Sequence, residues 1–156
     1  MLTPIDKAKY STTPLVAVFK LNGAERICGD FKVSLNPHLN AQRYPLPPVT
    51  EVLQTPAGGQ RFFKIDLADA YLQVELDEDS RMYIVLTTHK GLFRIHRLAC
   101  GLSAAPTIFQ SIIEQILRLV QRAQPYLDDL LVTGGTTTEH LAFLRLCFDR
   151  LRDAGI

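Results

Sequence analysis

The sequence predicts an α+β fold in which a largely antiparallel sheet packs against helices. Most of its apolar runs come in pairs separated by short turn sequences, as the strands of hairpins do. Two longer segments carry apolar residues at helical spacing, and strands grouped in this way favour helices on one face of the sheet. The chain has 156 residues, 47% of them hydrophobic and 21% charged, which suits a single globular domain.

The strand predictions rest on β-forming runs bounded by Gly, Pro and Asn. The first hairpin turns at Asn22-Gly23, a dipeptide that supplies the positive φ angles of a tight turn. An irregular connection is expected over residues 34–48, and Pro48 is placed to open a short helix through Leu53. The expected strands span residues 14–20, 25–30, 61–67 (a buried strand with Asp66 near its end), 82–88 and 92–98.

Two helices are expected in the second half of the chain. The first runs from about Ser103 to Gln121, with Ser103 as its N-cap and Pro106 in its first turn. The second begins at a capping box formed by Thr136 and Glu139 and ends at Gly155. Their apolar stripes consist of Ile108, Phe109, Ile112, Ile113, Ile116, Leu117 and Val120 in the first helix, and of Leu141, Leu144, Phe148 and Leu151 in the second.

The tetrad Tyr126-Leu127-Asp128-Asp129 lies between two β-forming runs and predicts a tight turn that carries two carboxylates. Such neighbouring charges repel each other unless a cation or a solvated turn compensates for them. Asp66 has a similar apolar setting. If folding brings Asp66 beside this turn, three carboxylates could hold two divalent cations about 3.5–4 Å apart, as in phosphoryl transfer. For an isolated Asp pair, an ordinary hairpin turn is the competing interpretation.

The charges are unevenly distributed along the chain. Residues 65–79 carry six acids and no base, whereas residues 1–64 have eight Lys or Arg against four acids and residues 80–156 have nine against six. An acidic centre between basic flanks suits a metal ion together with a polyanion, because metals need carboxylates and phosphates need positive charge. Charges scattered over a solvated surface are the competing interpretation.

Cysteine spacing and hydropathy favour a protein that is not secreted. Cys28, Cys100 and Cys147 lack the paired spacing of a zinc or redox motif, so reduced thiols are expected. No run of about 18 apolar residues predicts a membrane span, and the N-terminus lacks the apolar core of a signal peptide. Cytoplasm or nucleus is therefore the expected compartment.

Three segments, in this order, resemble motifs of reverse transcriptases. Residues 63–71 (FKIDLADAY) resemble motif A, residues 101–110 (GLSAAPTIFQ) resemble motif B, and residues 126–129 (YLDD) resemble motif C. Upstream, residues 26–32 and 43–47 resemble segments of the fingers. The pattern covers nearly the whole chain and is closest to polyproteins of gypsy-type LTR retrotransposons.

The resemblance implies a polymerase palm, with an antiparallel sheet packed on helices, plus a partial fingers hairpin and no thumb. Residues 1–156 would form one fingers/palm domain, and the thumb, ribonuclease H and integrase would lie beyond Ile156. An RNA or DNA template–primer and dNTPs are the implied partners, with no membrane, in a retroelement particle in the cytoplasm or in the nucleus. Fingers-like parts would be approximately residues 1–60 and 80–98, and palm-like parts residues 61–79 and 99–156.

The resemblance also implies RNA-directed DNA polymerase activity, in which two Mg²⁺ ions (or Mn²⁺) support nucleotidyl transfer to a primer 3′-hydroxyl. Asp66 and Asp128 would bind both metals, and Asp129 would complete the acidic cluster. Tyr71 would be the steric gate that excludes a 2′-hydroxyl. The implied dNTP-binding residues are Lys20, Arg26, Asp69, Ala70, Tyr71, Cys100, Gly101 and Gln110, and the implied template or primer contacts are Pro106 and Tyr126.

Some features depart from the family pattern. Cys100 stands where gypsy-type elements usually have Phe, and Pro125 cannot donate to a sheet ladder beside the acids. A decayed or co-opted fragment that binds nucleic acid or protein without catalysis is therefore the alternative function.

An unrelated two-metal phosphoesterase is a third interpretation. Such an enzyme would be expected to have metal-binding His, but none of the four His residues lies in the acidic motifs. Without thumb and primer grip, little processive synthesis is expected.

Overall fold

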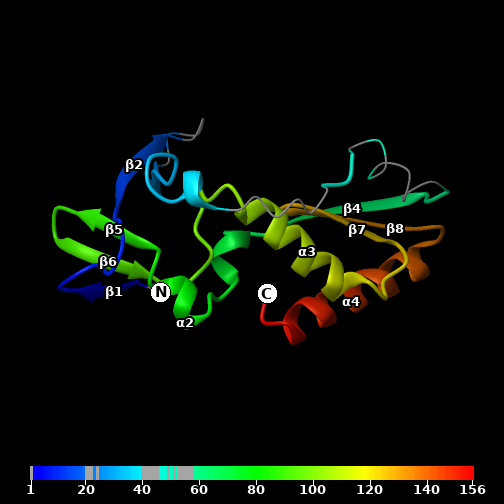
Figure 1. Ribbon diagram of the computed structural model, residues 1–156. Coiled ribbons are helices and arrows are strands. Elements are labelled where there is room, and N and C mark those ends of the chain that lie inside the picture. The colour runs from blue at the N-terminus through cyan, green and yellow to red at the C-terminus, as the bar shows by residue number, and fades with distance from the viewer. Residues whose placement is uncertain are drawn as a thin grey trace. The chain divides into compact units, whose positions relative to one another are not determined.

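The computed structural model describes residues 2–19, 25–39, 46–48 and 58–156, together with Gly23, Thr50 and Val52. The chain divides into two compact units, and each is described by itself. The first unit comprises residues 1–42 and 71–105, and the second comprises residues 43–70 and 106–156. Figure 1 labels most of their helices and strands, numbered in chain order.

The first unit contains a five-stranded sheet in the order β1-β6-β5-β2-β3. Its neighbouring strands are antiparallel except β2 and β5, which meet in parallel where Thr13 lies opposite Leu86. Both predicted hairpins of this unit are present, although Asn22 in the first turn lies outside the described residues. The strands of the second hairpin are shorter than the expected 82–88 and 92–98. The strands are β1 (Leu2–Ile5), β2 (Thr13–Phe19), β3 (Glu25–Gly29), β5 (Val85–Thr88) and β6 (Gly91–Ile95).

The sequence analysis missed β1 and the short helical turns of this unit. The strand β1 has only four residues and contains Pro4, which suits its place at the edge of the sheet. The remaining short elements are η1 (Asn36–His38), η2 (Ala70–Gln73, whose Ala70 belongs to the second unit) and α2 (Glu78–Arg81). Of the short helix expected after Pro48, only Thr50 and Val52 are described, and both are helical.

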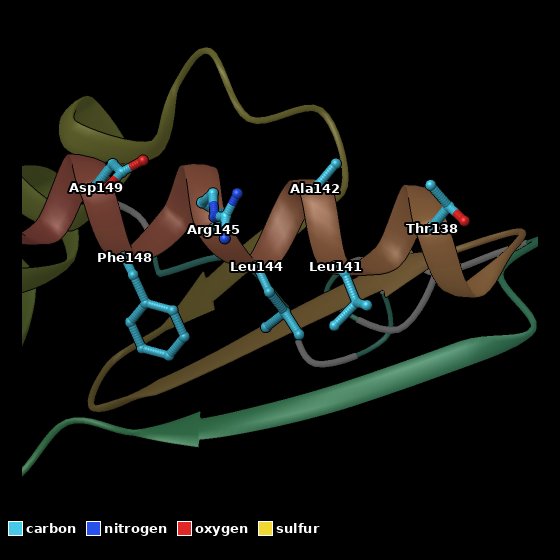
Figure 2. Close-up of a pocket in the computed structure, with 7 residues that line it drawn as sticks. All are labelled: Thr138, Leu141, Ala142, Leu144, Arg145, Phe148 and Asp149. Carbon is cyan, nitrogen blue, oxygen red and sulfur yellow. The ribbon is translucent and has the colours of Figure 1, made fainter.

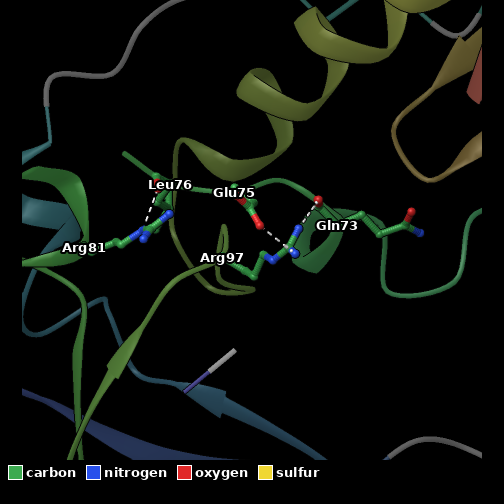
Figure 3. A network of polar contacts seen from close by, with 5 residues as sticks. All are labelled: Gln73, Glu75, Leu76, Arg81 and Arg97. Carbon is green, nitrogen blue, oxygen red and sulfur yellow. Dashed lines mark hydrogen bonds and ion pairs between the residues drawn. The ribbon is translucent and has the colours of Figure 1, made fainter. Parts of the chain in front are cut away.

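Two arginine side chains hold the segment between η2 and α2, Arg97 from the segment after β6 and Arg81 from α2. Arg97 donates to the carbonyl of Gln73 at 2.8 Å and pairs with Glu75 at 2.8 Å, as Figure 3 shows. Arg81 donates through Nε to the carbonyl of Leu76 at 2.7 Å. These side chains satisfy carbonyls that no regular ladder uses, so they hold an irregular stretch in one conformation.

The second unit contains a three-stranded antiparallel sheet in the order β4-β8-β7, with two helices. Leu130 and Val132 of the central strand alternate onto one face and are fully buried. Lys64, Asp66 and Asp129 follow the other alternation and share the opposite face. The elements are β4 (Arg61–Asp66), β7 (Ala123–Tyr126), β8 (Asp129–Gly134), α3 (Ala105–Leu117) and α4 (Thr137–Asp153).

The strand expected over residues 61–67 is present, but the expectation that it is buried was wrong. Phe62 and Phe63 are 56% and 50% exposed. The reason is position, because β4 is an edge strand with β8 as its ladder partner. An apolar run indicates a strand, but it does not tell a central strand from an edge strand.

The first long helix, α3, is shorter than expected, ending at Leu117 rather than near Gln121. After it, Val120 donates its backbone N–H to Leu117 and Ala123 donates to Val120, which turns the chain into β7. The predicted stripe is confirmed in part, because Phe109 and Ile113 have no exposed surface and Leu117 and Val120 have 3%. Its other members, Ile108, Ile112 and Ile116, are only half-buried.

Both ends of α4 match their sequence signals. The Thr136 hydroxyl accepts from the Glu139 N–H at 3.2 Å, and Glu139 Oε2 accepts from Gly135 N. At the other end, Gly155 has φ +77 and donates to Arg152, while Ile156 donates to Leu151. This pair of bonds is the Schellman motif.

The buried face of α4 differs from the predicted stripe. His140, Cys147 and Leu151 are buried, whereas Leu141 is 59% and Phe148 51% exposed. Figure 2 shows Leu141, Leu144 and Phe148 projecting from one side of the helix, where they line a groove with Thr138, Ala142, Arg145 and Asp149. Among the described residues, no helix is long and apolar enough to cross a membrane.

Candidate active site

The β4–β8 ladder brings two of the predicted acids together. Asp66 and Asp129 are register partners at the ends of these strands, so their side chains leave the sheet on the same face. Asp128 lies in the turn between β7 and β8, and its carbonyl accepts from the Leu67 N–H at 2.8 Å. Asp66 and Asp128 are exposed and Asp129 is partly exposed, so the acidic end of the sheet is open to solvent.

A lysine joins this acidic group. Lys64 Nζ lies 2.8 Å from Asp129 Oδ2. The hydrogen bond and charge of Asp129, followed by the charges of Asp66 and Asp128, raise the pKa of the Lys64 amine. The ammonium therefore interacts with all three acids. Sequence analysis did not identify Lys64 as a site residue, although its place two residues before Asp66 puts both on one face of a strand.

Gln110 on α3 holds the turn that carries Asp128. Its side chain is fully buried, and Oε1 accepts from the Leu127 N–H at 2.7 Å. Its Nε2 donates to the Pro125 carbonyl at 3.0 Å and to Glu114 Oε1 at 2.6 Å. Leu127 has φ 56, a left-handed conformation that is unfavourable for a branched side chain. Gln110 thus stabilises a strained turn from a buried position.

Pro125 is compatible with the hydrogen bonds of the β7–β8 ladder. In a hairpin closed by Tyr126 and Asp129, the next pair along, Pro125 and Leu130, is a non-hydrogen-bonded pair. Its missing N–H would have faced away from β8. Since β7 is also an edge strand, Pro125 removes no bond from the sheet.

Gly101, in the first unit, is packed closely against other backbone. It has φ +97, and a Cβ in its place would lie 2.8 Å from the Gly29 carbonyl oxygen. Asn36 supports this position, because its Nδ2 donates to the Gly101 carbonyl at 2.9 Å while its Oδ1 accepts from Ser103 N at 2.9 Å. Asn36 was not predicted, since an Asn-Pro dipeptide in a loop indicates only a turn.

Comparison with known proteins decides the family. A family model described as reverse transcriptase (RNA-dependent DNA polymerase) matches residues 25–156. The chain belongs to the reverse transcriptase family. It is 36% identical over 156 residues to an uncharacterized protein of Caenorhabditis elegans, covering 99% of this chain and 12% of that protein. It is 35% identical over 133 residues to the retrovirus-related Pol polyprotein from transposon 297 of Drosophila melanogaster, covering 84% and 12%.

Solved structures agree with this assignment at the level of the fold. The chain is similar to a foamy viral protease–reverse transcriptase in complex with double-stranded DNA, with a TM-score of 0.90 and 22% identity. That match covers 99% of this chain and 27% of the viral one. The native prototype foamy virus protease–reverse transcriptase gives a TM-score of 0.87 at 23% identity, covering 99% and 20%. The predicted α+β palm fragment of a reverse transcriptase is confirmed. The gypsy-type assignment stays a prediction.

The predicted site residues of this reverse transcriptase chain are divided between the two units. The second unit holds the three acids and Gln110, with Asp69, Ala70, Pro106 and Tyr126; the first unit holds Tyr71, Cys100 and Gly101. Lys20 lies outside the described residues. For Arg26, the structure describes the backbone, which pairs with Val18 in the β2–β3 hairpin.

The acids do not form a metal cage as they stand. Among the residues that the structure describes, no group of three or more His, Cys, Asp or Glu side chains is arranged to hold a metal ion. One oxygen of Asp129 is turned to Lys64 instead. The backbone does bring Asp66 and Asp129 to one end of one sheet face, with Asp128 in the adjoining turn, and the charges of all three raise the pKa of the Lys64 amine. The residue types therefore fit a divalent cation, because carboxylate oxygens are its preferred ligands, whereas their arrangement in this structure leaves Asp129 paired with Lys64.

Proposed function

We propose that this chain forms the catalytic part of an RNA-directed DNA polymerase, which transfers a nucleotide from a dNTP to a primer 3′-hydroxyl. One observation carries the proposal. Asp66 and Asp129 face each other across the β4–β8 ladder, and Asp128 lies on the adjoining turn at an open end of the sheet. Carboxylates placed in this way can serve a polyphosphate reaction, which needs positioned metal ions rather than a covalent intermediate.

Asp66 and Asp128 would hold two Mg²⁺ ions, with Asp129 completing the set, because carboxylate oxygens are the ligands that Mg²⁺ prefers. When bound, such ions neutralise phosphate charge and lower the pKa of the attacking hydroxyl. The Lys64 ammonium supports this assignment, since it is a cation already paired with Asp129, and the charges of Asp66 and Asp128 also raise its pKa. The exposed carboxylates also retain the rotamer freedom that binding an ion needs.

The remaining site residues are proposed to bind and orient the substrates. Tyr71 would exclude ribonucleotides by contact with the sugar. Lys20 and Arg26 would contact the triphosphate through charge-assisted hydrogen bonds. Other proposed nucleotide contacts are the backbone of Asp69 and Ala70 together with Cys100, Gly101 and Gln110, and proposed template or primer contacts are Pro106 and Tyr126.

The chain spans about 12% of the length of the relatives described above, so the partners of the whole protein are also proposals. We expect a template–primer, dNTPs and the further parts of a Pol polyprotein, namely thumb, ribonuclease H and integrase. A retroelement particle in the cytoplasm, or the nucleus, is the expected place of action.

Metal and nucleotide binding test this function directly. Purified chain should bind Mn²⁺ and, in its presence, dTTP, and the variants Asp66→Asn and Asp128→Asn should weaken both at least tenfold. Asp79→Asn is the matched control, because it removes an exposed carboxylate from α2 in the other unit. Nucleotide binding that is independent of metal and of both acids would favour the decayed, non-catalytic alternative.

A further inference from the structure

Lys64 is paired with one of the acids that would bind a divalent cation. It stands two residues before Asp66 on β4, so both side chains project from the same face of the sheet. Its ammonium lies 2.8 Å from Asp129, across the ladder from its own strand. An ammonium at this distance takes up lone pairs of the carboxylate that a metal ion would need.

Among the described residues, no second basic side chain forms an ion pair with these acids. Among the ion pairs between described residues, Lys64–Asp129 is the one that involves any of the three acids. The charges of Asp66 and Asp128 act on the same ammonium. Lys64 is therefore the ion-pair partner of Asp129, and the charges of the other two acids act on the same ammonium and raise its pKa.

The Lys64–Asp129 ion pair is also exposed enough to solvent for another ion or water to replace either partner. The side chains of Lys64 and Asp129 are 61% and 38% exposed, so water can replace either partner. Exposed ion pairs of this kind contribute little to stability, because solvent screens them and both side chains lose freedom in forming them. A doubly charged ion can thus take the carboxylates from Lys64 without disturbing a buried network.

We propose that Lys64 competes with divalent cations for the carboxylates of Asp66, Asp128 and Asp129, and so sets the metal affinity of the site. The proposal rests on the function given above, which requires that these acids bind metal. In this role, the ammonium balances part of the negative charge of the acids while no metal is bound. The same charge lowers the affinity with which a metal ion then binds.

Mn²⁺ binding to the purified chain tests the proposal, with free Mn²⁺ measured by electron paramagnetic resonance. Lys64→Met should bind Mn²⁺ about tenfold more tightly than the natural chain, because a unit positive charge a few ångström from the ion is removed. Lys64→Arg keeps the charge and should change the affinity less than about threefold. Unchanged or weaker binding by Lys64→Met would overturn the competition.

Arg61→Met is the matched control. It removes one positive charge from the same strand, and its odd spacing from Lys64 places it on the opposite face. Equal tightening in both variants would show a general charge effect and overturn the proposal. Circular dichroism of each variant verifies folding, and Lys64→Gln replaces Lys64→Met if the latter fails to fold.

The test separates this proposal from the proposed function. If Asp66→Asn and Asp128→Asn abolish Mn²⁺ binding but Lys64→Met has no effect, the acids bind metal and the role of Lys64 is refuted. If neither the natural chain nor Lys64→Met binds Mn²⁺, both proposals fail. If only Lys64→Met binds measurably, the competition is supported in its strongest form.

Discussion

The Gln110 side chain holds the backbone of Leu127. The 2.7 Å bond from the Leu127 N–H to Gln110 Oε1 joins α3 to the turn between β7 and β8, at the residue with φ 56. The neighbouring residue of that turn is Asp128. A buried helix side chain thus fixes the conformation of an exposed acidic turn, because the amide is fully enclosed and bonded at both its oxygen and its nitrogen.

Replacing Gln110 by Leu should therefore destabilise the protein by about 1–3 kcal/mol, because the partly buried Leu127 N–H and the buried Pro125 carbonyl lose their bonds to the Gln110 amide. Urea unfolding measures the change, and hydrogen exchange at the Leu127 amide should become faster. Gln115→Leu, at an exposed position on the same helix, should change the free energy of unfolding by less than about 0.5 kcal/mol. Equal losses in both variants would refute a specific role for Gln110.

Gly101 and Gly91 provide a second matched pair. Both have positive φ angles, +97 and +112, but a Cβ at Gly101 would meet the Gly29 carbonyl at 2.8 Å, whereas nothing lies within 4 Å of one at Gly91. Gly91→Ala should cost about 1–2 kcal/mol for the backbone conformation alone. Gly101→Ala should cost at least about 1 kcal/mol more, since backbone must move. Thermal or urea unfolding of both variants gives the comparison, and similar costs would contradict the close approach.

Cys147 should be the least reactive thiol of the chain. It is fully buried, and burial raises its pKa from 9.0 to about 11, whereas Cys28 and Cys100 are partly exposed. At pH 8, a thiol reagent should modify two cysteines quickly and the third only on unfolding. Fast labelling of all three in the folded chain would contradict this burial.

The same shift predicts a pH dependence. Because the folded state binds the Cys147 proton more tightly than the unfolded state does, its contribution to stability is complete below pH 9 and is lost as the pH rises towards 11. Cys147→Ala should remove this part of the loss of stability at alkaline pH. Its smaller side chain should also lower the stability at every pH. Unfolding curves between pH 8 and 11 measure it, and identical slopes for both proteins would refute it.

The N-cap of α4 can be tested in isolation. Thr136→Ala removes the acceptor for the Glu139 N–H and should cost about 1 kcal/mol. Thr136→Ser keeps the hydroxyl and should cost less than about half as much. Urea unfolding of the two variants distinguishes a capping effect from a general effect of the side chain's size.

Local signals in the sequence were sufficient for the elements that carry them. Apolar, β-forming runs predicted the strands around Asp66 and Asp129, and the Thr136 cap and Gly155 stop predicted both ends of α4. These features depend on residues a few positions apart, so one strand or one helix contains the information. Each of the three reverse transcriptase motifs is also a short continuous segment. The family could therefore be predicted from the sequence before any contact was known.

Packing between distant segments determines which side chains are buried and which of them pair, and local signals do not contain this information. Whether Phe63 is buried depends on how many strands pair with β4. Whether Phe148 is buried depends on which side of α4 packs against the sheet. The pairing of Lys64 with Asp129 requires the register of two strands that are more than 60 residues apart in the chain. By itself the sequence determined the kinds of elements, their order and the acids they carry. Only the tertiary structure decided which of those acids has a basic partner, because that depends on register and burial between distant segments.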